Sequence, residues 1–131
     1  MRITGAPPSS IPPVLNRTKG KATLLVDPDL SLLEARKLVL STANYSVRIA
    51  SAPRDVFQLQ PEEDPQIVVL SDTLGSFQLQ AVAEYVRHRW PRARILILGN
   101  AVPALEDALY DDSVEARFDA ADFLAVVRRC S

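Results

Sequence analysis

The sequence contains few of the residues on which several kinds of functional site depend. It has one cysteine, one histidine and four widely scattered glycines. The scattered glycines exclude a glycine-rich phosphate loop. Cys130 has no second cysteine with which to form a disulfide within the chain, which fits a reducing, cytoplasmic setting. His88 stands between Arg87 and Arg89, so we expect it on a charged helix face and find no support for a hydrolase triad.

The sequence also lacks a strong charge of either sign and a long apolar run. Its formal net charge of −1 at pH 7 gives no electrostatic reason to expect nucleic acid or an anionic membrane as a partner. No apolar run approaches the ~20 residues of a membrane-spanning helix, and the first residues do not show the pattern of a signal peptide. Four arginines gather around Trp90, where we expect a solvated helix end, with a docking patch as the alternative. They are Arg87, Arg89, Arg92 and Arg94.

What the sequence does contain is the pattern of one globular domain behind a short tail. Hydrophobic residues make up 47% and charged residues 24% of the 131 residues, which is typical of one soluble domain. Residues 1–19 hold two proline pairs among serine and glycine, without apolar periodicity, so we expect a disordered tail there. Residues 20–131 are expected to form the domain.

Three nearly continuous apolar runs indicate strands that are buried on both faces of a parallel sheet. They span residues 22–26, 67–70 and 94–98. Between these runs, apolar residues recur at helical spacing. The first stripe consists of Leu32, Ala35, Val39, Leu40 and Ala43, and the second consists of Leu79, Val82, Ala83, Val86 and Trp90. We expect Asp29 or Ser31 to cap the first of these helices.

Strands and helices alternate along the whole domain. The pattern predicts a strand over residues 45–50, a short helix opened by Pro53, a stunted helix over 103–109, an edge strand over 113–117 and a last helix beginning near Asp119. This alternation predicts an α/β three-layer sandwich. Its five-stranded parallel sheet is expected to have the flavodoxin-like strand order 2-1-3-4-5.

Polar residues follow the buried strands where such a sheet would bind a ligand, beside the point at which the strand order reverses. The sequence places Asp27 and Asp29 after the first strand, Ser71 and Asp72 after the third, and Gly99 after the fourth. Clustered carboxylates can hold Mg²⁺ through their oxygens, so Asp27, Asp29 and Asp72 are candidate metal ligands. A helix cap or a loop position facing water is the alternative for each aspartate.

Over residues 21–129 the pattern resembles the receiver domain of bacterial response regulators. No one segment is specific, but the order and spacing of the segments together are similar to that family. The segments are Leu24–Asp29, Asn44–Val47, Pro65–Leu70, Tyr85–Arg87, Trp90–Pro91 and Arg94–Leu98. The resemblance implies an acidic pair that binds Mg²⁺, an aspartate after the third strand that accepts a phosphoryl group, and a hydroxyl and a lysine that support it. Phosphoryl transfer depends mostly on such positioning and charge neutralisation.

The chemical positions of the family are only partly filled in this sequence. Asp27 is present, but Pro28 stands where the family has a second acidic residue. The phosphoacceptor position falls on Ser71, and Asp72 comes one residue late, which reverses the direction of a side chain along a strand unless a bulge intervenes. The positions equivalent to the supporting hydroxyl and to the Lys-Pro pair of the switch are occupied by Gly99, Ala116 and Arg117.

These substitutions favour a signalling domain that is not an enzyme. We expect a pseudo-receiver that binds a protein partner in a two-component or phosphorelay pathway, without phosphorylation and without a cofactor. The alternative is an active phosphoacceptor that uses Asp72 with Mg²⁺. A small flavin- or nucleotide-binding protein on the same fold is a third alternative. The sequence identifies neither the partner nor the oligomeric state.

Overall fold

The computed structural model describes residues 21–60, 63–99, 109–114 and 120–130. The tail expected over residues 1–19 lies outside these ranges, as does all of the helix expected over 103–109 except Leu109. The predicted boundary between tail and domain therefore stays a prediction.

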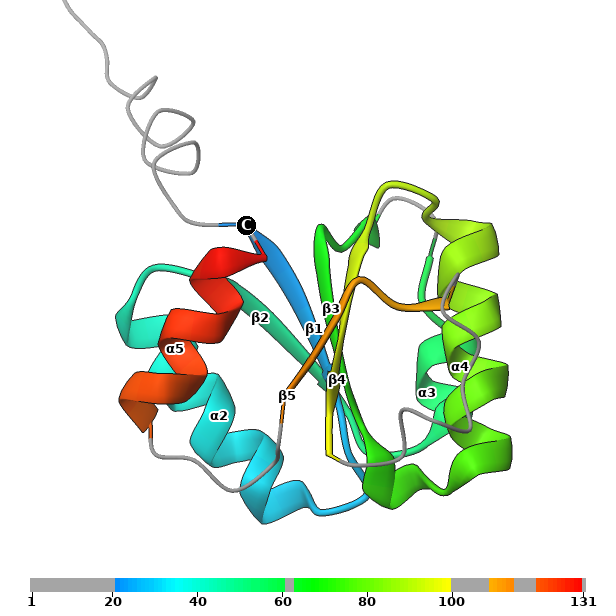
Figure 1. Cartoon of the computed structure of the whole chain (residues 1–131), viewed down its shortest axis with the longest axis horizontal. Helices are drawn as coiled ribbons and strands as arrows, with labels where there is room; N and C mark the ends of the chain where they lie inside the picture. The colour runs from blue at the N-terminus through cyan, green and yellow to red at the C-terminus, as the bar shows by residue number, and fades with distance from the viewer. Residues whose placement is uncertain (1–20, 61–62, 100–108, 115–119, 131) are drawn as a thin grey trace, which may run out of the picture.

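Five parallel strands form the central layer (Figure 1), and this confirms the predicted sheet. Their order is β2-β1-β3-β4-β5, and each neighbouring pair is parallel. The strands are β1 (Ala22–Val26), β2 (Ser46–Ala50), β3 (Ile67–Ser71), β4 (Arg94–Leu98) and β5 (Asp112–Val114). The edge strand expected over residues 113–117 is β5, and residues 115–119 lie outside the described part of the chain.

Helices cover both faces of the sheet, which gives the predicted three layers. Helices α2 (Leu30–Thr42) and α5 (Ala120–Arg129) lie on one face, and α3 (Pro53–Phe57) and α4 (Ser76–Arg89) lie on the other (Figure 1). A 3₁₀ turn, η2 (Asp72–Leu74), joins β3 to α4. None of the helices that the structure describes is long and apolar enough to cross a bilayer.

The apolar runs of the central strands supply a core on each face of the sheet, because successive side chains of a strand point to opposite faces. All five residues of β3 are buried. Under α4 and α3 the strands contribute Leu24, Val26, Val68, Leu70, Ile95 and Ile97. Under α2 and α5 they contribute Leu25, Ile67, Val69, Leu96 and Leu98.

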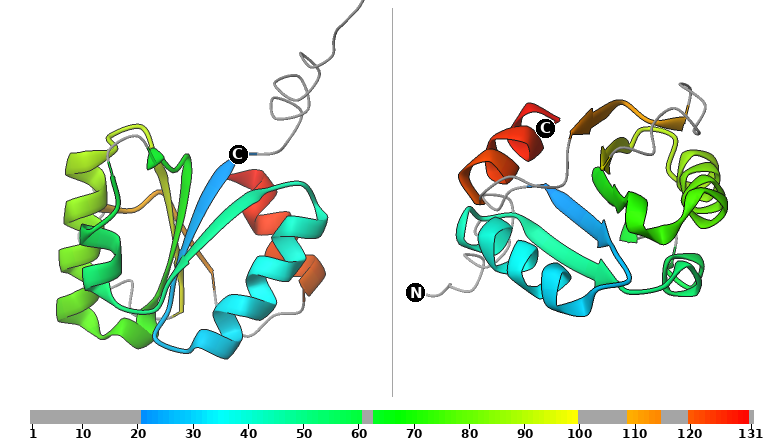
Figure 2. Two further views of the ribbon diagram at one scale, coloured as in Figure 1. Left: turned by 180° about the vertical axis from the view of Figure 1, so that it is seen from behind. Right: turned by 60° about the horizontal axis from the view of Figure 1, so that its bottom comes forward.

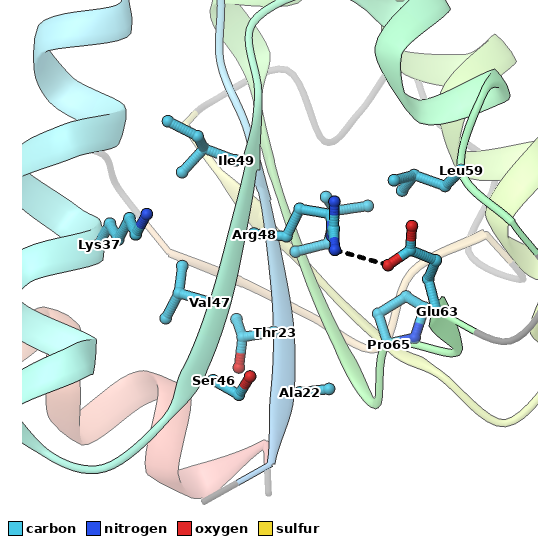
Figure 3. Close-up of a pocket in the computed structure, with 11 residues that line it drawn as sticks. Ala22, Thr23, Lys37, Ser46, Val47, Arg48, Ile49, Leu59, Glu63 and Pro65 are labelled. Atoms are coloured by element: carbon cyan, nitrogen blue, oxygen red, sulfur yellow. Dashed lines mark ion pairs between the residues drawn. The ribbon is translucent and has the colours of Figure 1, made fainter.

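Strand β2 forms one edge of the sheet and alternates in exposure as the sequence predicts. Figure 3 shows Val47 and Ile49 on the side of Lys37, and Arg48 on the opposite side, where it pairs with Glu63 at 2.7 Å. Charged side chains beside an edge strand discourage pairing with another chain. The same residues line a cavity of about 470 Å³ along this edge (Figure 3).

The beginning of α2 confirms one local prediction and corrects another. Asp29 is the N-cap, and its carboxylate accepts a hydrogen bond from the Leu32 N–H at 3.2 Å. The first part of the expected apolar stripe, however, is displaced by one residue: Leu33 is fully buried, whereas Leu32 is 43% exposed. Leu40, further along the stripe, is buried as predicted. One residue corresponds to about 100° around a helix. This rotation turns Arg36, rather than Ala35, towards the sheet.

We therefore expect neighbouring truncations in α2 to differ in their effect on the free energy of unfolding. Leu33→Ala should destabilise the protein by about 2–5 kcal/mol, because it leaves a cavity in the core. Leu32→Ala should cost less than about 1 kcal/mol, because Leu32 is exposed and lies outside the core. Urea unfolding of both variants measures the difference. Equal losses, or a larger loss for Leu32→Ala, would contradict the rotation of α2.

Candidate functional site

The carboxyl ends of β1, β3 and β4 bring the predicted site residues to one rim of the sheet. Val26 pairs with Leu70, so Asp27 and Ser71 leave neighbouring strands at the same level. Ser71 in turn pairs with Leu98, and Gly99 follows at the end of β4. Figure 2, right, brings this rim towards the viewer. The predicted juxtaposition of the residues after β1, β3 and β4 is thus present.

Both carboxylate oxygens of Asp27 are engaged by groups of the protein. The side chain is 1% exposed. Its Oδ1 accepts a hydrogen bond from the Asp29 N–H at 2.7 Å, and a longer one, 3.4 Å, from the Thr73 hydroxyl. Its Oδ2 forms an ion pair with Nη1 of Arg36 at 2.8 Å. A buried carboxylate needs such compensation, since an unpaired charge in the interior is strongly destabilising.

Arg36 is a site residue that the sequence analysis did not identify. It projects from the middle of α2, and its side chain is only 15% exposed. The spacing of the sequence could have indicated its role, because Arg36 lies three residues after Leu33 and four before Leu40 and so shares their helix face. Both leucines are fully buried. A cation within the buried stripe of a helix requires an anionic partner on the facing layer. The stripe chosen from the sequence, which began at Leu32, hid this pattern.

Ser71 and Thr73 form a small hydroxyl group beside Asp27. Ser71 is buried, and its Oγ lies 2.7 Å from Oγ1 of Thr73. The Thr73 N–H also donates to the Ser71 Oγ at 3.3 Å, which caps η2. Through Thr73 this pair connects to Asp27. At the level of Asp27 the rim therefore contains the buried, hydrogen-bonded hydroxyl of Ser71, the residue that the sequence analysis placed at the phosphoacceptor position.

The Asp72 carboxylate lies at the end of β4, against Gly99. A Cβ placed on Gly99 would clash with the carboxylate carbon of Asp72. The carboxylate thus fills the space that a side chain at position 99 would occupy. Gly99 has φ +131°, a backbone conformation that glycine adopts readily and other residues do not. Asp29, the third candidate ligand, uses its carboxylate in the cap of α2.

These residues do not fit a Mg²⁺ site in the observed arrangement. Mg²⁺ requires near-octahedral oxygen ligands, but the Asp27 oxygens are taken by Arg36 and by the Asp29 N–H. No group of three or more acidic, histidine or cysteine side chains that could hold a metal occurs within residues 21–60, 63–99, 109–114 and 120–130. Ala116 and Arg117, which the sequence analysis placed at the position of the family's lysine, lie outside those ranges.

Comparison with solved structures places this architecture among known folds. No protein-family model matches the sequence, and no curated protein has significant sequence similarity to it. A response regulator from Thermotoga maritima superposes with a TM-score of 0.74 at 16% identity, covering 84% of this chain and 96% of that one. The T. maritima response regulator TrrA, in complex with Mg²⁺-BeF, gives a TM-score of 0.74 at 19% identity over 86% of this chain and 100% of that one. The chemotaxis response regulator CheY4 of Vibrio cholerae gives 0.70 at 15% identity, over 85% and 98%.

The strand order and the polar rim define a flavodoxin-like α/β protein. Within that class, the likeness to these structures shows that the chain has the CheY-like receiver fold of response regulators. This confirms the fold that the sequence resemblance implied.

The contact between Asp72 and Gly99 predicts an energetic coupling between these two positions. Gly99→Ala should lower the free energy of unfolding through both backbone strain, about 1–3 kcal/mol, and a clash with the Asp72 carboxylate. Asp72→Ala in the same chain should remove the clash and give a coupling energy of about 1 kcal/mol or more, measured in a double-mutant cycle.

Gly75 provides the matched control, because it also has a positive φ, +88°, but a Cβ there would meet nothing within 4 Å. Gly75→Ala should therefore lower the free energy of unfolding through backbone strain alone, and its effect should add to that of Asp72→Ala. If Gly99→Ala and Asp72→Ala are additive to within about 0.5 kcal/mol, the carboxylate does not rest against Gly99.

Proposed function

We propose that this chain is a two-component-type signalling domain with a receiver fold, and that it acts by binding a protein partner without being phosphorylated. One observation carries the proposal: the Asp27 carboxylate has an internal counter-ion, Arg36, 2.8 Å away. In a phosphoacceptor site that charge would have to be available to a metal ion. Here a bound metal would first have to displace the guanidinium and the Asp29 N–H.

The position of Asp72 supports the same proposal. In-line phosphoryl transfer requires the nucleophile, the metal and the supporting groups to meet at one point. The Asp72 carboxylate lies against Gly99, which has no hydroxyl, while the group directed at Asp27 is the Thr73 hydroxyl. The residue beside the candidate nucleophile at the end of β4 therefore supplies no supporting hydroxyl. The proposal accordingly assigns no catalytic residue and no enzymatic activity.

Apolar side chains on the same rim support contact with a protein. Phe77, in the first turn of α4, is 86% exposed, and Leu30, the first residue of α2, is 51% exposed. Both helices begin at the carboxyl ends of strands, next to Asp27 and Asp72. Exposed aromatic and aliphatic side chains of this kind are common anchors of protein interfaces. The chain has a formal net charge of −1, so a protein partner suits this rim better than nucleic acid does.

The proposed setting is a reducing cytoplasm, which suits the free, buried thiol of Cys130.

The proposal predicts that phosphodonors leave the protein unmodified. Isotopically labelled protein is incubated with Mg²⁺ and either acetyl phosphate or beryllofluoride, and its intact mass and amide shifts are recorded. We expect no covalent adduct and no saturable change at the amides of Asp27, Ser71 and Asp72, because Arg36 already neutralises the Asp27 carboxylate.

Two variants make this test specific. Asp72→Asn removes the candidate acceptor, and Asp64→Asn removes an exposed carboxylate before β3, at the opposite end of the sheet. An adduct that forms on the wild type and on Asp64→Asn but not on Asp72→Asn would establish the active phosphoacceptor and overturn the proposal. A yellow purified protein would instead support the flavin-binding alternative.

A further inference from the structure

A basic pocket lies at the end of the sheet opposite the rim that contains Asp27. Its volume is about 470 Å³, and its described lining residues are Lys21, Gln66, Arg92, Arg94, Arg129 and Cys130. They come from the amino ends of β1, β3 and β4 and from the end of α5. Figure 1 shows the start of β1 beside the end of α5 at this end of the molecule. None of these residues belongs to the site proposed above.

The lining carries an excess of positive charge that nearby acidic residues neutralise only in part. Four of the described lining residues are cationic and none is acidic. Arg129 pairs with Asp112 at 2.7 Å. Within the part of the chain that the structure describes, neither Arg92 nor Arg94 has a carboxylate at ion-pair distance. Both arginines are exposed, so their guanidinium groups are accessible to a ligand.

The second acidic residue nearby, Asp111, is committed to other groups. It accepts hydrogen bonds from the Ile95 N–H at 2.8 Å and from Arg87 at 3.1 Å. Partial burial acts to raise the pKa of Asp111, but these hydrogen bonds and the nearby arginines hold it below its usual range. The carboxylate is thus fixed in place by Arg87 and the backbone. Its charge is shared between Arg87 and Arg94, so it offsets part of the positive charge of the pocket and leaves that of Arg92.

The remaining polar groups of the lining suit an anionic ligand. Burial raises the pKa of the Cys130 thiol, so near neutral pH the thiol is uncharged and adds no negative charge. The Gln66 side chain is exposed and brings a neutral amide donor to the same pocket. Guanidinium groups bind phosphate oxygens through paired, charge-assisted hydrogen bonds. A pocket of this volume is within the range that holds a small molecule.

We propose that this pocket binds a diphosphate group, either free or carried by a small molecule. Several cations within one small pocket match a compact ligand of multiple negative charge better than a single carboxylate. A polymeric anion is disfavoured, because it would require basic residues well beyond the pocket on a chain whose formal net charge is −1. The site lies at the other end of the sheet from Asp27, so it stands independently of the signalling role.

Inorganic pyrophosphate is the probe for this site, and its binding is followed through the amide shifts of the labelled full chain. We expect saturable shifts centred on Gln66, Arg94 and Cys130. Arg92→Gln and Arg94→Gln should each weaken binding about tenfold or more, because each removes charge-assisted hydrogen bonds. Both side chains are exposed, so we expect the variants to fold, and their unfolding curves check this.

Arg54→Gln is the matched control, since it removes the same charge from an exposed position on α3. It should bind pyrophosphate as the wild type does. Shifts that never saturate, or that decrease equally in Arg54→Gln and Arg94→Gln, would show general attraction to the surface and overturn the proposal. A parallel titration with a nucleoside diphosphate distinguishes the two sources of the group. Tighter binding with additional shifts indicates a nucleotide, and equal binding indicates free diphosphate.

Discussion

The ion pair between Asp27 and Arg36 is the interaction on which the arrangement of the rim depends. Asp27 closes β1 at a point where its carboxylate is almost completely buried, and a charge there requires a partner of opposite sign. The partner comes from α2, the helix that follows β1 directly. Arg36 lies on the same side of α2 as Leu33 and Leu40, which face the core, whereas Leu32 is exposed. One pair of charges thus links the rotation of a helix to the chemistry of the site.

The rest of the rim follows from a single offset in sequence. Ser71 occupies the level of Asp27, and the next residue, Asp72, begins a 3₁₀ turn that carries its carboxylate to the end of β4. There Gly99 leaves the space that it needs. A side chain at position 99 and a carboxylate at position 72 in this orientation exclude one another. Glycine at position 99 therefore allows the Asp72 carboxylate to occupy this place at the end of β4.

The fold could be predicted from the sequence because its determinants are local and repeated. The continuous apolar runs identify β1, β3 and β4, the alternating run over 45–50 identifies β2, and Asp29 identifies the start of α2. The site could be predicted only as a set of residues at one rim. Which way Asp72 turns depends on a contact with Gly99, 27 positions later in the sequence. The part played by Arg36 depends on the rotation of α2, and an error of one residue in the helical stripe conceals it.

A double-mutant cycle on Asp27 and Arg36 tests most directly whether Arg36 is the counter-ion of the buried carboxylate. Arg36→Gln should lower the free energy of unfolding by about 2–4 kcal/mol, somewhat below the value for a fully buried pair, since the guanidinium keeps some contact with water. Asp27→Asn added to Arg36→Gln should restore most of that loss, because the uncompensated charge is then gone. If the two substitutions are additive, the ion pair does not stabilise the rim, and Asp27 is available to a metal ion after all.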